Sequence, residues 1–180
     1  YYEGLTSYPA ARCVRILNPL SADLNVMRQT LLFNTMEAVQ LNANRRNGNL
    51  RLYEFGNCYF YDEAARDAEK PLSAYSEQYR LAIAVTGAAV PQSWNAKPQA
   101  SSFFTLRAVA EKLLRRFGLD IYALKCEPLQ SDLFGDGISL SAGNGRELLQ
   151  MGVVAPRIRR AFDLKQEVYY LEMNFDALVK

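Results

Sequence analysis

Residues 138–154 read ISLSAGNGRELLQMGVV, and the turn at their centre decides the fold class. Tight hairpin turns prefer the dipeptide Asn144-Gly145, because both of its positions accept a positive φ. It predicts an antiparallel hairpin between a strand at Ile138–Ala142 and a strand at Glu147–Val154. Such a hairpin favours a sheet of antiparallel neighbours over one built from parallel crossover units.

Outside this hairpin, apolar periodicity predicts further strands and helices. Strands are expected at 12–17, 50–61, 79–85, 121–126 and 168–175, with a bulge at Gly56. Helices are expected at 31–43, capped by Thr30 and ended by Gly48, at 106–117, closed by Gly118, and at 156–162. Surface loops are expected at 62–78 and 88–101. The order of these elements predicts one α+β domain over residues 1–180, a mostly antiparallel β-sheet flanked by helices.

The composition excludes several classes of chemistry. The 180 residues include no histidine, which rules out Ser-His-Asp and Cys-His catalysis and histidine metal ligands. Cys13, Cys58 and Cys126 are too scattered for a zinc site or a disulfide framework, and they indicate a reducing cytoplasm. The 21 basic and 19 acidic residues nearly balance, which argues against a dedicated nucleic-acid clamp or a membrane anchor.

Motifs for targeting and for ligand binding are also missing from the sequence. The apolar runs are too short to cross a membrane, and the chain opens at Tyr1 without a methionine or signal segment, so we expect an internal piece of a longer cytoplasmic polypeptide. No phosphate loop or dinucleotide fingerprint occurs. The acids Glu54, Asp132, Asp136 and Glu172 lie far apart, so we expect exposed carboxylates and assign no metal ligand.

Two groups of residues have both a functional and a purely structural interpretation. Arg157, Arg159 and Arg160 follow Pro156, and a solvated helix face is favoured over contact with the phosphates of a tRNA. Trp94, Phe103 and Phe104 would suit a base-stacking platform, but aromatic residues near a helix start are more often core.

Short patterns in a fixed order run along nearly the whole chain. They are VRILNPLS at 14–21, MRQTLL at 27–32, LRLYEFG at 50–56, TG at 86–87, SW at 93–94, FFTL at 103–106, MGVVAP at 151–156 and VYYLE at 168–172. Together they resemble the β chain of the bacterial phenylalanyl-tRNA synthetase family. Ala155 departs from that family, which usually has histidine there.

The resemblance implies a class II synthetase-like module that pairs with the catalytic α chain and has lost its own active site, so no catalytic residue is assigned. Class II enzymes carry Arg-x-Glu on a strand, where residues two apart point to one face. Here Arg51 and Glu54 are three apart, and a regular strand would send them to opposite faces. We interpret the pair as a degenerate remnant of the nucleotide motif, although a bulge in the strand would restore the facing.

The resemblance further implies a subunit interface at the first strand and the segment after it. The expected interface residues are Asn18, Pro19, Leu20, Met27, Arg28, Leu31 and Leu32. For Leu31 and Leu32 a place in the core is an equal alternative.

By the same resemblance, the whole enzyme attaches phenylalanine to its tRNA with ATP and magnesium, and it contains two α and two β chains. This domain itself is expected to bind no cofactor. Support of the α chain is the leading hypothesis, contact with tRNA comes second, and a surviving ATP site at Arg51 and Glu54 comes last.

Overall fold

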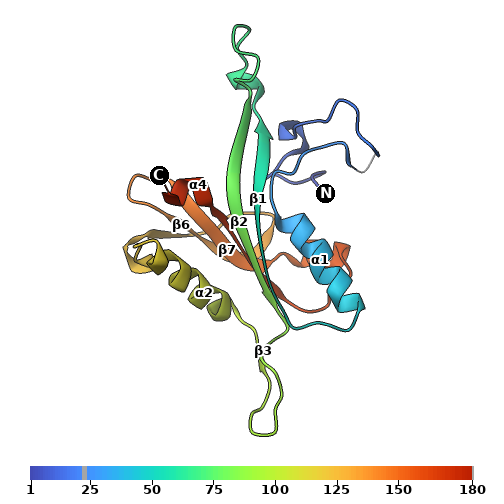
Figure 1. Cartoon of the computed structure of the whole chain (residues 1–180), viewed down its shortest axis with the longest axis vertical. Coiled ribbons are helices and arrows are strands. Elements are labelled where there is room, and N and C mark those ends of the chain that lie inside the picture. The colour runs from blue at the N-terminus through green and yellow to red at the C-terminus, as the bar shows by residue number, and fades with distance from the viewer. Residues whose placement is uncertain (22–23, 180) are drawn as a thin grey trace.

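Across residues 1–21 and 24–179, which the computed structural model describes, the central sheet has six strands in the order β1-β2-β8-β7-β6-β5 (Figure 1). Each strand pairs antiparallel with its neighbours. The strands are β1 (Leu50–Tyr61), β2 (Tyr75–Thr86), β5 (Lys125–Pro128), β6 (Phe134–Ser141), β7 (Glu147–Val154) and β8 (Val168–Asn174). A separate small hairpin pairs β3 (Ala88–Val90) with β4 (Gln99–Ala100).

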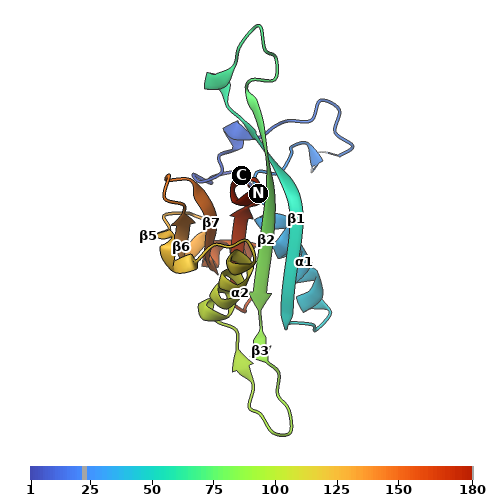
Figure 2. The same ribbon diagram turned by 60° about the vertical axis from the view of Figure 1, so that its left-hand side comes forward.

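Helices cover both faces of the sheet, which confirms the predicted α+β class. The helices are α1 (Leu32–Asn44), α2 (Phe103–Arg116), α3 (Pro156–Ala161) and α4 (Phe175–Val179). Short 3-10 helices lie at η1 (Ala10–Arg12), η3 (Glu63–Ala65) and η4 (Ile121–Ala123). Figure 2 shows α1 and α2 on opposite sides of the β1–β2 pair.

Alternation along the strands divides the buried side chains between two cores. The first core lies under α1 and includes Leu32, Met36, Val39, Cys58, Phe60, Ala82, Ala84, Val154, Val168 and Tyr170. The second lies under α2 and includes Leu81, Val85, Leu106, Ala110, Leu114, Leu149, Met151, Leu171 and Met173. We call these two sides of the sheet the α1 face and the α2 face.

Several turns follow the local signals in the sequence. The turn at Asn144-Gly145 joins β6 to β7, and Gly145 has the positive φ of 80° that the turn needs. Helix α2 begins with a capping box between Ser102 and Thr105, and it ends before Gly118, which has a φ of 76°. Pro156 occupies the first turn of α3.

The predicted strand at 12–17 is wrong. Residues Ala10–Arg12 form a 3-10 helix, and beyond it Arg15 and Val26 form an isolated antiparallel bridge. Alternation of charged and apolar residues favours a strand only where one face is buried, and here Ile16 and Leu17 both face solvent.

The bulge at Gly56 is also wrong, because β1 pairs with β2 without a register shift and Gly56 lies opposite Arg80. The reason for a glycine is a neighbouring side chain: a Cβ at this position would lie 2.0 Å from Nη2 of Arg28. Position 56 therefore leaves room for a guanidinium and does not bend the strand.

Other boundaries differ by a few residues. Helix α1 starts after Leu31 and ends near Arg46, which adopts a φ of 61°, so Gly48 does not end it. Strand β2 begins at Tyr75, which shortens the loop expected up to residue 78. The strand expected at 121–126 divides into η4 and β5, and the irregular segment at 88–101 contains the β3–β4 hairpin.

The β1–β2 ribbon is the longest feature of the molecule, and a projecting segment extends from each of its ends (Figure 1). The connection 62–74 lies at one end, and the β3–β4 hairpin lies at the other.

Candidate functional site

The segment that precedes α1 is an exposed loop with apolar side chains. Its two limbs are held together where Ile16 N donates to the Asn25 carbonyl (2.9 Å) and Met27 N donates to the Val14 carbonyl (2.8 Å). Leu17 is 97% exposed and Leu20 is 100% exposed. A group of apolar side chains so fully in solvent indicates a surface that another molecule covers.

The expected interface residues fall into three groups in the structure. Asn18, Pro19 and Leu20 lie on the exposed loop, whereas Met27 and Arg28 are half-buried. Leu31 and Leu32 have no exposed surface and pack in the core of the α1 face. These two leucines therefore take the core alternative and offer no surface to a partner.

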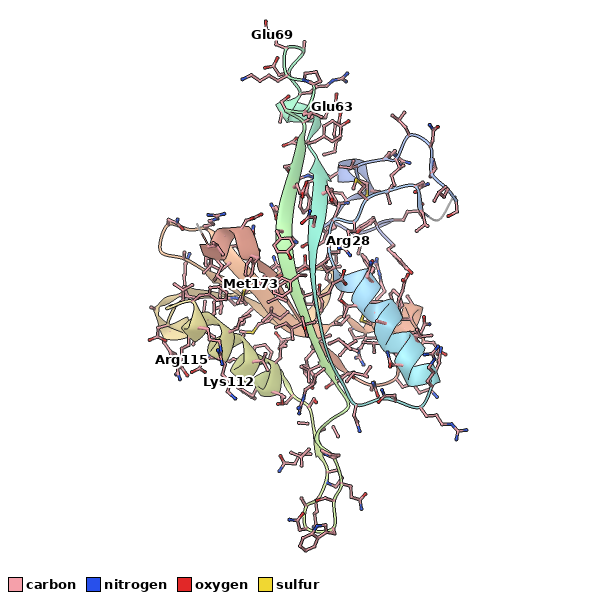
Figure 3. The ribbon with its side chains drawn as sticks, viewed as in Figure 1. Arg28, Glu63, Glu69, Lys112, Arg115 and Met173 are labelled. Carbon is pink, nitrogen blue, oxygen red and sulfur yellow. The ribbon has the colours of Figure 1, made fainter. Side chains whose placement is uncertain are left out.

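Arg28 fastens the loop to the edge strand β1 (Figure 3). Its Nη1 forms an ion pair with Oε1 of Glu54 at 2.5 Å, and its Nε donates to the Asn57 carbonyl at 3.0 Å. The Arg28 carbonyl in turn accepts from Tyr59 N at 2.8 Å. These contacts make Arg28 a residue that positions the loop, and Gly56 is the position that lets it pass over the strand.

Arg51 and Glu54 do not come together. Because β1 runs without a bulge, the two side chains lie on opposite faces of the strand. Arg51 Nη2 donates to the Ala89 carbonyl at 2.7 Å, and Glu54 pairs with Arg28. The described residues thus give these two side chains separate partners and no shared pocket.

The three arginines of α3 have different surroundings. Arg159 is half-buried, and it donates to the carbonyls of Val154 and Gln166. Arg157 and Arg160 are exposed, and Arg160 Nε donates to the Pro156 carbonyl at 3.2 Å. Only these two outer arginines present their charge to solvent.

The aromatic residues do not form a stacking platform. Phe103 packs against the core of the α2 face, and Phe104 points to solvent at the start of α2. Trp94 lies at the end of the β3–β4 hairpin and is 96% exposed, so the expectation of a place in the core is wrong for Trp94 and for Phe104.

A buried ion pair on the α1 face is the main feature that the sequence did not reveal. Arg80 Nη1 lies 2.5 Å from Oε1 of Glu172, and Oε2 of Glu172 accepts from Thr30 Oγ1 (2.5 Å), Leu31 N (3.2 Å) and Tyr170 Oη (2.6 Å). Glu172 was expected to be exposed, but it is 7% exposed. Its carboxylate joins the N-terminal end of α1 to the sheet. The helix dipole favours an anion at that end of the helix.

Burial and the Glu172 charge also change the acidity of the surrounding groups. Burial raises the pKa of the Cys58 thiol to about 12, and the negative charge of Glu172 acts in the same direction. Burial likewise raises the pKa of Tyr170 and of Tyr8, each with Glu172 as the second cause. A thiol with so high a pKa is unreactive at neutral pH, so Cys58 is a buried structural thiol. The signal that would have revealed it is Glu172 within the apolar strand VYYLEMN.

Among residues 1–21 and 24–179, no group of three or more Cys, Asp or Glu side chains is placed to hold a metal ion. In the same part of the chain, no helix combines the length and the apolar character that crossing a bilayer requires.

Comparison with known families and sequences gives one consistent result. Residues 2–175 match the family described as the phenylalanyl tRNA synthetase beta chain CLM domain. The chain is 44% identical over 180 residues to the phenylalanine–tRNA ligase beta subunit of Bacteroides thetaiotaomicron and 38% identical over 179 residues to that of Porphyromonas gingivalis. These alignments cover 100% and 99% of this chain but 22% of each relative, so the chain spans about a fifth of their length.

A solved structure shares the fold at low sequence identity. The pyrrolysyl-tRNA synthetase of Desulfitobacterium hafniense superposes with a TM-score of 0.65 at 15% identity, over 94% of this chain and 52% of that one. The sheet and its flanking helices therefore have the architecture of a class II aminoacyl-tRNA synthetase.

Proposed function

This chain belongs to the family of the phenylalanyl-tRNA synthetase β chain CLM domain, and from that premise we propose that it is the supporting, non-catalytic domain of a phenylalanine–tRNA ligase β chain. In this role it would hold the catalytic α chain in place while the α chain attaches phenylalanine to tRNA. The observation that carries the proposal is the exposure of Ile16, Leu17, Leu20 and Leu24 on the loop that Arg28 ties to the edge of a class II-like sheet.

The geometry of the loop supports a role in binding a partner. Leu17 and Leu20 bury almost none of their surface within the chain, so their contact with a second chain would remove apolar area from water. On α1, which follows the loop in the chain, Leu41 is also exposed, near the C-terminal end of the helix. The separation of Arg51 from Glu54 supports the view that the domain does not itself form an adenylate.

The proposed assembly contains two α and two β chains in the cytoplasm, and residues 1–180 form one domain of the β chain. ATP and magnesium would bind to the α chain. A surviving ATP site in this domain is the least favoured reading, because Glu54 is already paired with Arg28.

The test is complex formation between this chain and the α chain, measured by light scattering at micromolar concentration. Leu20→Asp should weaken the complex about 30-fold, as expected when an interface residue worth about 2 kcal/mol is lost. Tyr122→Asp is the control, because Tyr122 is 72% exposed but lies in η4, beside α2 on the other side of the sheet. Arg28→Ala is a poorer probe, since it also removes the contact with Glu54.

Equal affinity of the Leu20→Asp variant and the unchanged chain would contradict the assignment of the loop. Absence of any complex, both for this chain and for a full-length β chain, would contradict the proposed function itself.

Contact with tRNA through Arg157 and Arg160 is the second candidate, favoured by the exposure of both side chains. Each phosphate contact contributes about 0.9 to the slope of log affinity against log salt. The double variant Arg157→Ala/Arg160→Ala should therefore lower the slope by about 2 in filter binding with tRNA. A salt slope that is unchanged in the variant would exclude these arginines from the contact.

A further inference from the structure

The single tryptophan of the chain lies where it makes almost no packing contribution to the fold. Trp94 lies at the end of the β3–β4 hairpin with 96% of its surface in solvent. Exposure of so large an apolar side chain costs free energy that burial in another molecule would recover. Trp is also the residue type most enriched among those that dominate binding energies.

The hairpin that carries Trp94 ends in a hydrogen-bonded turn. Ser93 N donates to the Ala96 carbonyl at 3.1 Å, and Ser93 Oγ donates to Oδ1 of Asn95 at 2.8 Å, which closes a tight turn around the tryptophan. Pro91 and Pro98 flank the turn and restrict φ on both limbs. A side chain on a stiff support loses little conformational entropy when it binds.

The charge of the hairpin distinguishes it from the opposite end of the ribbon. Residues 88–102 contain a single charged residue, Lys97, whereas the 62–74 connection contains six, including Glu63 and Glu69 at its end (Figure 3). Depletion of charge around an aromatic residue is typical of the centre of a protein–protein interface. One cation in the hairpin is also too little to hold a phosphate backbone, since nucleic-acid affinity comes mainly from several such contacts.

The base of the hairpin is joined to the end of α1. Asn49, in the turn after the helix, accepts at Oδ1 from Ala88 N (2.8 Å), and Arg51 donates to the Ala89 carbonyl (2.7 Å). Figures 1 and 2 both place the loop before α1 and the helix itself on one side of β1, with the hairpin beyond the end of the helix. The hairpin thus extends from the end of the ribbon next to the C-terminal end of α1, and it leads into the start of α2.

We propose that Trp94 inserts into an apolar pocket of the α chain and forms a second point of attachment, at the opposite end of α1 from Leu17 and Leu20. This inference rests on the proposed function and adds a contact to it. The pocket on the α chain should be uncharged and large enough for an indole ring, because Lys97 is the only charge near the tryptophan in the sequence.

The test uses the fact that the chain has a single tryptophan. Incorporation of 5-fluorotryptophan gives one ¹⁹F resonance, which reports on position 94 alone when the α chain is unlabelled. On binding to the α chain, the resonance should shift, and a dissolved paramagnetic chelate should broaden it several-fold less than in the unbound chain. Light scattering on the same sample measures separately whether the complex has formed.

The outcomes separate this inference from the proposed function. A complex in which the resonance keeps its unbound position and its broadening would overturn the insertion of Trp94 while the proposed function stands. Failure to form a complex would instead count against the proposed function. A shift on adding tRNA alone, or full protection in a β chain without the α chain, would assign Trp94 to a different occupant and overturn the proposal.

A matched pair of variants gives the size of the contribution. Trp94→Ala should weaken binding of the α chain about 30-fold, and Tyr122→Ala, at an exposed aromatic residue beside α2, should change it less than twofold. Trp94 is 96% exposed, so its truncation leaves no cavity in the core and the variant should keep the folded state. Equal affinity of both variants would overturn the proposal.

Discussion

The two faces of the sheet are built on different principles. The α1 face is organised around the buried ion pair between Arg80 and Glu172, with Thr30 and Tyr170 bonded to the same carboxylate. Among the described residues, the apolar cluster of the α2 face has no such buried ion pair beside it: the pair on α2, between Arg115 and Glu111, is partly exposed to solvent. The ion pair joins positions that are 92 residues apart, whereas α2 needs only its own apolar stripe and its capping box.

The difference shows which helix has its position on the sheet fixed by directional contacts and which is held by apolar packing alone. Hydrophobic contacts have little directional preference, so α2 is held on the sheet by the apolar surface area that it buries. A buried carboxylate must have its partners at hydrogen-bond distance, so Glu172 fixes the start of α1 to within that tolerance. The fixed end of α1 is the end that carries the proposed α-chain loop, and this is where the domain needs accuracy.

Removal of the buried carboxylate should give the largest effect. Glu172→Ala leaves Arg80 buried without its counter-ion, which should lower the free energy of unfolding by about 3–5 kcal/mol in urea denaturation. Addition of Arg80→Met should recover part of that loss, because an apolar pair replaces an unpaired charge.

The matched experiment on the α2 face uses Met151, which is fully buried. Met151→Ala should cost about 2–5 kcal/mol from the lost contacts and the cavity, and a second truncation, Leu106→Ala, should add to the loss. If Arg80→Met deepened the loss from Glu172→Ala in the same way, the distinction between the two faces would be wrong.

Much of the α2 face could be predicted from the sequence, and much of the α1 face could not. The helix expected at 106–117 and the turn at Asn144-Gly145 rest on local signals, and the structure has both, although α2 begins at Phe103 and buries Leu114 while Val109 and Phe117 are partly exposed. On the α1 face, the reason for Gly56 is Arg28, a residue 28 positions away. A rule based on neighbouring residues cannot detect a contact between positions so far apart in the sequence, and it predicts a bulge at Gly56 instead.

The candidate site shows the same limit. The exposure of Leu20 and the burial of Leu31 depend on where the loop lies against β1, and the sequence pattern is apolar at both positions. Trp94 was expected in the core because aromatic residues usually are, yet its hairpin turns it away from the sheet. Only tertiary placement separates an apolar residue that stabilises the fold from one that is available to a partner.

Alkaline pH should destabilise the α1 face with an intermediate effect. Burial raises the pKa of Cys58 from 9.0 to about 12 and that of Tyr2 from 10.0 to about 12. Above pH 9 the unfolded chain loses these protons while the folded chain keeps them, so stability falls as pH rises. The fall should approach about 1.4 kcal/mol per pH unit for each group between its two pKa values.

Urea denaturation at pH 8, 9, 10 and 11 measures this slope. Tyr2→Phe should reduce the slope above pH 10, because the phenol that it removes titrates only in the unfolded chain there. Tyr169 is the control at the edge of the α2 face: a hydrogen bond to Glu167 raises its pKa to about 12, but solvent screens the pair. A larger change of slope in Tyr169→Phe than in Tyr2→Phe would contradict the assignment to the α1 face.

The smallest effect concerns two hydroxyl groups next to the two helix starts. Thr30 Oγ1 donates to Glu172 and accepts from Leu32 N at 3.1 Å, so it is fully used at the start of α1. Ser101 Oγ, before α2, is buried and has no hydrogen-bond partner among the described residues. Thr30→Ala should cost about 1–2 kcal/mol, whereas Ser101→Ala should be neutral or stabilise by up to about 1 kcal/mol.

Opposite signs in urea denaturation, at an unchanged dependence on urea concentration, are the expected result. They would follow from the rule that an unpaired buried hydroxyl costs free energy, while a paired one is costly to remove. If Ser101→Ala were as damaging as Thr30→Ala, the α2 face would also depend on a polar contact at its helix start. The comparison would then reduce to the ion pair of Arg80 and Glu172 alone, and the accuracy of the α1 face would have to be attributed to that pair without help from Thr30.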